Sequence, residues 1–147
     1  MPTIEKFLPT ARKRMSCIGS DAALLQAARL LESGQDMLLV CDAGGRMLGV
    51  LTKTDTVRQI GICTGASCTA PVIEAMTREV TTTTPEGRLE DAWGIMKARG
   101  FKNIPVVDPD GKPLGVLNAR DVLQILWHDV QKEEELLFNY VMNVGYR

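Results

Sequence analysis

The stretch "GVLNARDVL", residues 115–123, has a counterpart in "GVLTKTDTV", residues 49–57. Each stretch contains Gly-Val-Leu, a residue that can cap a helix, two spacers and an aspartate. A short apolar run followed by a capping residue predicts a strand that leads directly into a helix. Because the two stretches lie 66 positions apart, they predict one structural unit that occurs twice.

The repeat extends upstream to a turn. Asp42 begins "DAGG" and Asp108 begins "DPDG", again 66 positions apart. Each of these sequences separates two apolar runs, a pattern that predicts two short strands joined by a tight turn.

A helix is expected before each pair of strands. The segments "DAALLQAARLLESG" and "EGRLEDAWGIMKARG" carry apolar residues at helical spacing. Ser20 and Thr84 are expected to cap the first turns of these helices. Gly34 and Gly100 are expected to end them in the left-handed conformation.

The predicted repeat unit is strand, helix, strand, strand, helix. Its first strands are expected over residues 15–18 and 80–84, and its last helices over about residues 53–60 and 119–131. The fold class is therefore α/β (α+β), with two units related by a pseudo-twofold axis. Such an axis leaves a cleft on each side of the interface between the units, so a duplicated motif predicts duplicated sites.

These units divide the chain into four parts. Residues 1–62 hold an N-terminal segment and the first repeat, residues 63–76 a linker, and residues 77–131 the second repeat. The linker is expected to contain a short helix over 71–76, and residues 132–147 form a C-terminal helix and tail. Because a unit of about 60 residues buries little of its surface alone, the two repeats are expected to pack on each other.

Composition indicates an ordinary globular chain. It has 147 residues, 45% of them hydrophobic, and a net charge of −1, which gives no broad attraction to nucleic acid or membranes. Apolar runs such as residues 37–41 are far shorter than the roughly 18 residues needed to span a bilayer. The N-terminus "MPTIEKFLPT" lacks the apolar stretch of a signal peptide. We therefore predict a cytoplasmic protein that binds neither nucleic acid nor membranes.

The four cysteines predict a reduced protein. Cys17 and Cys41 fall in expected strands, where a free cysteine behaves as a small buried hydrophobe. Cys63 and Cys68 bracket "TGAS" in the linker, where a redox or metal role is conceivable. With a single histidine in the chain, His128, this is a weak zinc signal, and we predict no metal site.

Each repeated motif has two interpretations. Thr52 and Asn118 stand where a strand meets a helix, with Asp55 and Asp121 three residues later, so each pair can form a capping box. Alternatively, the helix N-terminus holds a phosphate and the aspartate accepts both hydroxyl groups of a ribose. The glycine that begins each motif would then let a ligand approach the backbone closely.

The chain resembles a tandem pair of CBS (cystathionine β-synthase) domains, together called a Bateman module. "GVLTKTD" and "GVLNARD" match the signature Gly-apolar-apolar-Thr/Ser-x-x-Asp, and the resemblance covers about residues 15–130. It implies non-catalytic, regulatory binding of AMP, ADP or ATP, or of NAD or S-adenosylmethionine, in clefts between the repeats. It also implies a homodimer and a regulated protein that the sequence does not identify.

The resemblance assigns roles to particular residues. Asp55 and Asp121 become ribose partners, and Thr52 lies near the phosphate. Asn118 departs from the signature, although its amide can still donate to phosphate, and Arg120 could contact phosphate as well. The full expected set is Ile18, Met37, Leu38, Thr52, Lys53 and Asp55 in the first repeat, and Thr82, Thr83, Thr84, Lys102, Asn103, Ile104, Pro105, Asn118, Arg120 and Asp121 in the second.

The two expected sites differ in charge. Asp36 stands in the first repeat where the second has Lys102, and an acidic residue there would repel a polyphosphate. Together with Arg120, Lys102 therefore favours the cleft of the second repeat for a charged nucleotide.

Other function classes remain open. Catalysis is not expected, because no nucleophile motif is present and one histidine cannot supply a conventional triad. A module without a ligand could instead serve as a dimerising or partner-binding scaffold, which the substitutions Asn118 and Asp36 favour. A thiol-based redox sensor is a third alternative. The apolar C-terminal segment "EEELLFNYVMNV" could cross a dimer interface or fold back on its own subunit.

Overall fold

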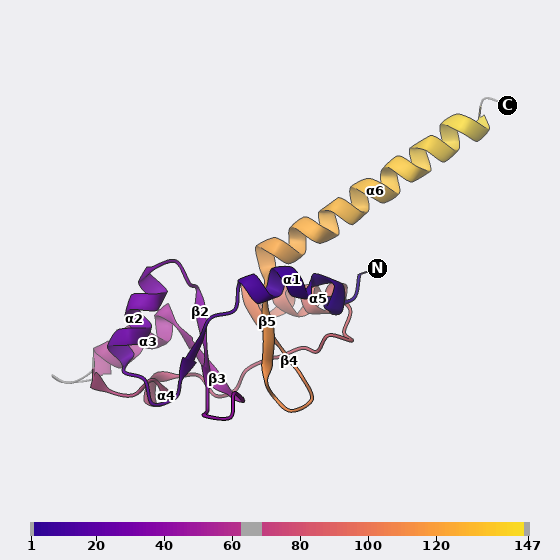
Figure 1. Cartoon of the computed structure of the whole chain (residues 1–147). Coiled ribbons are helices and arrows are strands. Elements are labelled where there is room, and N and C mark those ends of the chain that lie inside the picture. The colour runs from indigo at the N-terminus through magenta and orange to yellow at the C-terminus, as the bar shows by residue number, and fades with distance from the viewer. Residues whose placement is uncertain (1, 63–68, 146–147) are drawn as a thin grey trace.

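A computed structural model describes residues 2–62 and 69–145 of the chain (Figure 1). Its elements in chain order are α1 (Ile4–Lys13), β1 (Cys17–Gly19), α2 (Leu24–Glu32), β2 (Met37–Cys41), β3 (Met47–Thr52), α3 (Lys53–Ile62), α4 (Val72–Ala75), α5 (Leu89–Arg99), β4 (Asn103–Val107), β5 (Pro113–Asn118) and α6 (Ala119–Gly145). The predicted order of strand, helix, strand, strand, helix is confirmed for the first repeat. The short helix expected at the end of the linker is confirmed as α4.

The two hairpins are built to the same plan. β2 pairs antiparallel with β3, and Met37 faces Thr52. β4 pairs antiparallel with β5, and Asn103 faces Asn118, so both pairs are displaced by the same 66 positions. Both hairpins also contain a bulge before the last residue of their first strand. The predicted duplication therefore holds down to the register of the strands.

The two turns confirm the duplication in atomic detail. The Asp42 carboxylate accepts hydrogen bonds from the amides two and four residues later, at 2.9 and 3.0 Å. Asp108 makes the same two hydrogen bonds, both at 2.9 Å. Gly45 and Gly111 adopt φ angles of 85° and 83°, a conformation that side chains disfavour. These contacts are local, which is why the turn sequence predicts them.

The first strand of the second repeat is reduced to a single bridge. Thr83 pairs parallel with Val106. Apart from this single bridge, residues 80–84 do not form a strand. In the first repeat, by contrast, β1 pairs parallel with β2 over three residues. The strand predicted over 80–84 is therefore wrong. Backbone hydrogen bonds link this segment to β4 only at Thr83.

The helix ends are partly as predicted. Gly100 ends α5 with a φ of 71°, and Gly34 follows α2 with a φ of 116°. Ser20 and Thr84 do not cap α2 and α5, because neither helix has a side-chain hydrogen bond at its N-cap. Instead, the first amide of each helix donates a hydrogen bond to a backbone carbonyl of another segment. Tertiary contacts thus replace the expected side-chain caps.

Each repeat is completed by the segment that precedes the other repeat. Helix α1 comes before the first repeat but packs on β5 of the second (Figure 1). Its Ile4, Phe7 and Ala11 are buried in the same cluster as Leu89 of α5. Helix α4, before the second repeat, buries Val72 in the core of the first. The two repeats are therefore interlocked along the chain.

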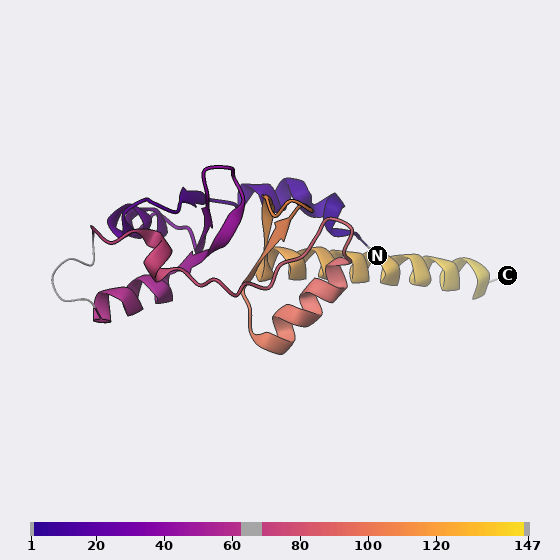
Figure 2. The ribbon, with the colours of Figure 1, turned by 90° about the horizontal axis from the view of Figure 1, so that it is seen from below.

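A third core joins the two repeats, which lie side by side in Figure 2. Met37, Leu39 and Val50 of the first repeat are buried in one cluster with Val116 of the second. This confirms the expected packing of the repeats on each other. It also places β2, β3 and β5 next to the clefts between the repeats.

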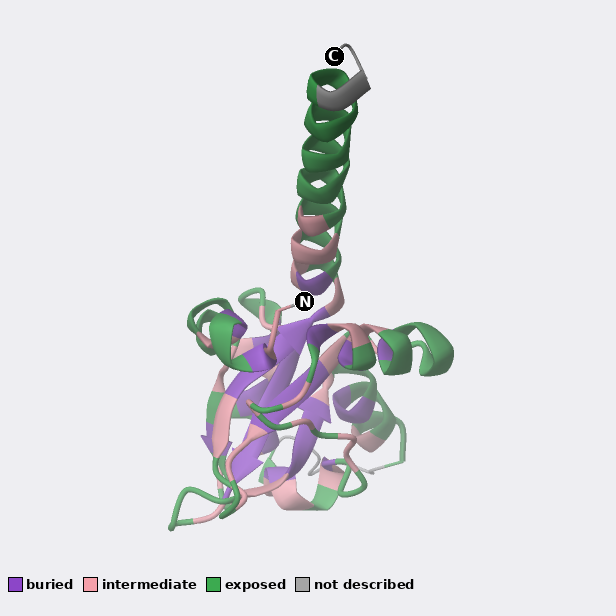
Figure 3. Cartoon of the chain, turned by 90° about the vertical axis from the view of Figure 1, so that its right-hand side faces the viewer, coloured by how far each residue is buried: buried purple, intermediate pink, exposed green. Residues whose placement is uncertain are grey.

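Helix α6 leaves the body of the protein. It runs without a break over Ala119–Gly145, so the two helices expected on either side of residue 131 are one. From residue 131 to residue 143 every side chain is exposed (Figure 3). The helix therefore does not fold back on its own subunit. None of the helices in the described ranges is both long enough and apolar enough to cross a membrane.

Candidate functional site

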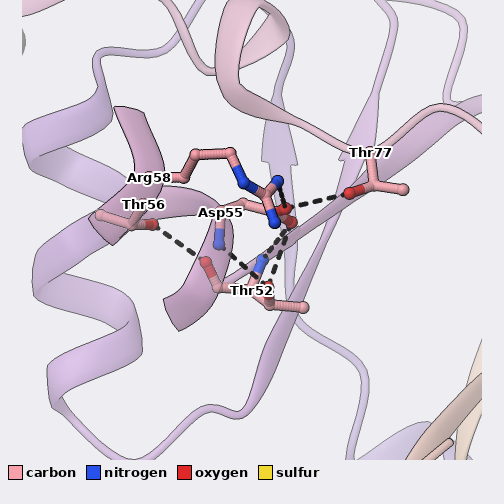
Figure 4. A network of polar contacts seen from close by, with 5 residues as sticks. All are labelled: Thr52, Asp55, Thr56, Arg58 and Thr77. Atoms are coloured by element: carbon pink, nitrogen blue, oxygen red, sulfur yellow. Dashed lines mark hydrogen bonds and ion pairs between the residues drawn. The ribbon is translucent and has the colours of Figure 1, made fainter. Parts of the chain in front are cut away.

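The first motif forms the predicted capping box at the start of α3 (Figure 4). The amide of Asp55 donates to Oγ1 of Thr52 at 3.2 Å. The amide of Thr52 donates in return to Oδ2 of Asp55 at 3.0 Å. The box is reciprocal and satisfies two amides that would otherwise lack partners.

The Asp55 carboxylate lies at the centre of a larger network. Its side chain is only 5% exposed. Oδ2 also accepts from the hydroxyl of Thr52 at 3.1 Å, while Oδ1 accepts from Thr77 at 3.0 Å and from Arg58 at 3.2 Å. These donors occupy about four acceptor positions, which is all that a carboxylate offers. Arg58 is 65% exposed, so it is the partner that a ligand could displace at the lowest cost.

The second motif is built differently. Asn118 accepts a hydrogen bond from the amide of Arg120 at 3.1 Å and donates to Asn103 at 3.0 Å. The carboxylate of Asp121 does not bond to the amide of Asn118, as the carboxylate of Asp55 does to the amide of Thr52. It accepts two hydrogen bonds from Arg14, at 2.7 and 2.8 Å, and the hydrogen bonds to Asp121 raise the pKa of Arg14. The prediction of a second capping box is therefore wrong, because the carboxylate of Asp121 binds a distant arginine instead.

A cavity of about 230 Å³ lies where the first motif meets the second repeat. Both apolar side chains and polar groups line it. It is lined by Met37, Val50, Thr52, Asp55, Thr77, Glu79, Val80, Thr81, Phe101, Asn103 and Pro105. The first repeat thus contributes the capping box, and the second contributes the beginning of β4.

A wider groove of about 740 Å³ shares Thr52 and Asn103 with this cavity. Lys53, Lys102 and Arg120 line it, together with Asp36. Three positive charges therefore face one negative charge. Thr54, Gly100 and Asn118 complete the lining.

The counterpart of the first cavity is almost filled. Gln35 and Met37 of the first repeat correspond to Phe101 and Asn103, which lie 66 positions later. Gln35 and Met37 line a cavity of only about 20 Å³. Its other lining residues are Arg14, Gly34, Asp36, Asn103 and Val116. This volume holds little more than one water molecule.

A family model described as "CBS domain" matches residues 10–61 and 72–128. The chain belongs to the CBS-domain family. Together the two matched segments cover most of the chain, and they correspond to the two repeats. The resemblance seen in the motifs is thereby confirmed, as is the α+β fold of a CBS pair.

Known relatives support the same conclusion. Arabinose 5-phosphate isomerase GutQ of Escherichia coli K12 is 37% identical over 102 residues, which are 69% of this chain and 30% of the isomerase. CBSX2, solved in complex with AMP, is 25% identical with a TM-score of 0.74 over 87% of this chain and 98% of CBSX2. A CBS-domain containing protein from Agrobacterium tumefaciens is also 25% identical, with a TM-score of 0.71 over 84% and 98% of the two chains.

The CBS pair combines the predicted residues differently from the sequence-based expectation. Thr52 and Asp55 of the first repeat share a cavity with Asn103 and Pro105 of the second. Asp121 was expected to share a site with Asn103 and Pro105 of β4, but it lies against Arg14. The grouping of each aspartate with its own repeat is wrong, because the repeats face each other across the clefts.

The expected contrast in charge also disappears. Asp36 and Lys102 line the same groove, together with Lys53 and Arg120. The sequence places Asp36 and Lys102 at matching positions of the two repeats, but in space the repeats present them to one shared surface. Charge therefore does not favour the cleft of the second repeat.

Three of the apolar residues expected in the site lie in the cores. Leu38 is 0% exposed, Ile104 is 1% exposed and Ile18 is 5% exposed, and none lines the cavities described above. Neighbouring residues on a strand point to opposite faces. Met37 and Asn103 therefore face the clefts, while Leu38 and Ile104 face the helices.

The threonine segment before α5 is shifted relative to the prediction. Thr82 and Thr84 are exposed and do not line the cavity, and Thr83 bonds through its backbone to β4. Val80 and Thr81 line the cavity in their place. Sequence reasoning also missed Val50, Thr77, Glu79 and Phe101 as lining residues. Of these, only Phe101 carried a signal, since it directly precedes the expected Lys102–Pro105 segment.

The motif glycines are not open to a ligand. A Cβ atom on Gly49 would collide with the carbonyl oxygen of Thr77. A Cβ atom on Gly115 would lie 2.8 Å from the Cβ of Ala11 in α1. The interpretation that these glycines admit a ligand is therefore wrong. In each repeat, the segment that precedes the other repeat occupies this space.

The cysteines also differ from expectation. Cys41 is buried as predicted, and burial, with lesser contributions from Cys17 and Asp42, raises the pKa of its thiol to about 12. Cys17 is exposed, because the alternation of β1 turns Ile18 inward instead. Cys63 and Cys68 lie outside the described residues. Within residues 2–62 and 69–145, no three histidine, cysteine, aspartate or glutamate side chains are grouped to hold a metal ion.

Proposed function

We propose that this CBS pair is a non-catalytic regulatory module that binds an adenosine nucleotide in the cavity at Thr52 and Asp55. The observation that carries the proposal is the junction of this cavity with the basic groove at Thr52 and Asn103. A pocket with apolar walls and a carboxylate adjoins a groove with three cations there. These are the three kinds of group that a base, a ribose and a phosphate require.

The cavity suits the base. Met37, Val50, Val80 and Pro105 supply apolar surface for the faces of an adenine. The ring of Phe101 stands in the same lining, and Arg99 stacks on it with its guanidinium carbon 4.9 Å from the ring centre. This cation–π contact holds the ring in place.

Asp55 is the ribose acceptor in this proposal. The two hydroxyl groups of a ribose are donors, and the Oδ1 atom already accepts from the two donors Thr77 and Arg58. A ribose can therefore replace the exposed Arg58 without leaving a buried acceptor unpaired. The capping hydrogen bonds of Oδ2 to Thr52 remain in place.

The groove supplies the phosphate contacts. Lys53, Lys102 and Arg120 surround the space next to Thr52, and their charges complement a phosphate. Because three cations outnumber Asp36, the proposal favours AMP, ADP or ATP over S-adenosylmethionine, which has no phosphate. NAD remains a candidate through its pyrophosphate.

Binding at this place would couple the two repeats. The ligand would contact Thr52 and Asp55 on one side and Phe101 and Pro105 on the other. A ligand that binds one arrangement of the repeats more tightly shifts the protein toward that arrangement. The AMP complex of the similar CBSX2 supports a nucleotide as this ligand. We propose that a protein partner then senses the arrangement.

Calorimetric titration tests this proposal. Purified protein, checked by mass spectrometry for ligand that is already bound, is titrated with AMP, ATP, NAD, S-adenosylmethionine and adenosine. We expect AMP or ATP to bind below millimolar concentration and Lys102→Ala to weaken ATP more than adenosine. Lys112→Ala, in the exposed turn between β4 and β5, is the matched control and should leave both unchanged. The absence of binding by all five compounds would overturn the proposal.

A second candidate function is assembly, and helix α6 is the observation that favours it. Leu136, Leu137, Phe138, Tyr140 and Val141 are each more than 60% exposed on it. An isolated helix with an exposed apolar surface of this kind is only marginally stable in water. We therefore propose that the protein is a homodimer in which α6 contributes to the interface.

A further inference from the structure

Arg14 is held in a defined position by the fold. It follows the last turn of α1, and its amide donates to the carbonyl of Ala11 at 3.2 Å. Ala11 is completely buried against Gly115 of β5, and Ile4 and Phe7 anchor the rest of the helix. A helix from the N-terminal segment therefore presents a guanidinium group to the second repeat.

The target of that guanidinium group is the second motif. Nε and Nη2 of Arg14 contact the two oxygens of Asp121 at 2.7 and 2.8 Å. The Asp121 side chain is left only 12% exposed, and the Arg14 side chain 43% exposed. This paired geometry is the strongest that an arginine and a carboxylate form. It takes one acceptor position on each oxygen, so a ribose that bound Asp121 at these positions would have to displace the guanidinium group.

The cavity at the corresponding positions of the other cleft is small, and Arg14 is part of its lining. Arg14 lines the cavity of about 20 Å³ at Gln35 and Met37, whose counterpart at Phe101 and Asn103 measures about 230 Å³. Related positions in the two repeats thus enclose very different volumes. Arg14 is the one cation in the lining of the smaller cavity.

We infer that Arg14 closes the second cleft of the pair, so that one chain takes up a single adenosine nucleotide, at Asp55, and the Asp121 cleft opens only when Arg14 leaves. This inference rests on the proposed function. The fold thereby makes two repeated sites unequal through a residue that lies outside both motifs.

The arginine at the first motif does not close its cleft in the same way. Arg58 lies three residues from Asp55 on the same helix and makes one contact of 3.2 Å. Its side chain is 65% exposed and can turn into solvent without disturbing another element. Arg14 makes two shorter contacts and bridges two distant segments. The cost of displacement is therefore higher at Asp121.

The substitution Arg14→Met tests the inference, because it keeps the aliphatic stem and removes the guanidinium. Arg12→Met is the matched control, since Arg12 is an exposed residue of the same last turn. Titration of the full chain with AMP and ATP should give one site per chain for the natural protein and for Arg12→Met. Arg14→Met should give two, with the affinity of the second cleft raised by about tenfold or more.

A double variant keeps the result specific. In Arg14→Met combined with Asp121→Asn, the second binding event should be lost and the first retained, and circular dichroism should verify that each variant is folded. Two events in the natural protein, or identical isotherms for the natural protein and folded Arg14→Met, would overturn the inference while the proposed function stands. If neither the natural protein nor Arg14→Met binds any nucleotide, it is the proposed function that fails.

Discussion

Arg14 and Asp121 are 107 residues apart in the chain, yet their side chains meet in a two-point ion pair at 2.7 and 2.8 Å. The pair ties the end of α1 to the first turn of α6. The buried Asp55, the counterpart of Asp121, accepts a hydrogen bond from Thr77 and closes a capping box with Thr52. Two copies of one motif thus have different partners and are expected to respond differently to mutation.

Asp55→Ala is expected to destabilise the protein more than Asp121→Ala. Loss of Asp55 leaves the partly buried amide of Thr52 without its acceptor and also removes the acceptor of the exposed Thr77 hydroxyl, at a cost of about 1–3 kcal/mol. Asp121 has a partly exposed partner, so its loss should cost about 1 kcal/mol or less. Urea denaturation measures both values, and titration with ATP measures binding separately. Equal stability losses would contradict the buried network described for Asp55.

The motif glycines are expected to be intolerant of alanine for a packing reason. Gly49→Ala and Gly115→Ala should each lower the free energy of unfolding by about 1–3 kcal/mol, because the new methyl group meets Thr77 or Ala11. Gly94→Ala is the control, since a Cβ there meets nothing within 4 Å and lies inside α5. It should stabilise the protein by about 0.5–1 kcal/mol. A neutral Gly115→Ala variant would show that α1 is not packed as described.

The buried thiol of Cys41 is expected to make stability fall at alkaline pH. Its pKa lies at about 12 instead of 9.0, so the folded protein keeps a proton that the unfolded chain loses. The contribution is complete below pH 9 and declines toward pH 12, by up to about 1.4 kcal/mol per pH unit. Urea denaturation between pH 8 and 10.5 should show a smaller decline for Cys41→Ala than for the natural protein. Parallel curves would rule out this linkage.

The same pKa predicts how the thiols react. In a Cys63→Ser, Cys68→Ser background, the exposed Cys17 should be alkylated at pH 8 and Cys41 only after unfolding, because the thiolate is the reactive form. Mass spectrometry of digests after iodoacetamide treatment identifies the labelled residue. This background should also keep the fold and the ligand response under oxidising conditions. A response to oxidation that disappears in it would support the redox alternative for the linker cysteines.

Helix α6 is expected to carry the dimer contact. Leu137→Glu combined with Val141→Glu should shift the mass measured by light scattering from dimer to monomer. The melting temperature of the monomer body should change little, because both residues are more than 60% exposed in the single chain. Glu133→Gln combined with Glu135→Gln is a control on the same exposed helix. A natural protein that is monomeric across micromolar concentrations would contradict the proposal.

The local structure could be predicted from the sequence alone. Periodicity indicated the helices, and the spacing of 66 residues predicted two hairpins with identical register. The turns at Asp42 and Asp108 and the capping box at Thr52 were also predictable, because their hydrogen bonds join residues at most four positions apart. The family followed from the two copies of the motif.

The composition of the sites was decided only by tertiary structure. The sequence contains the repeats but does not show which face of one repeat meets the other, so it could not group Asp55 with Phe101 and Pro105. Nor could it show that α1 crosses to the second repeat, fills the space above Gly115 and brings Arg14 to Asp121. Such contacts depend on how buried apolar faces pack together. Because the hydrophobic effect that drives this packing is not directional, no local pattern in the sequence records which partners will meet.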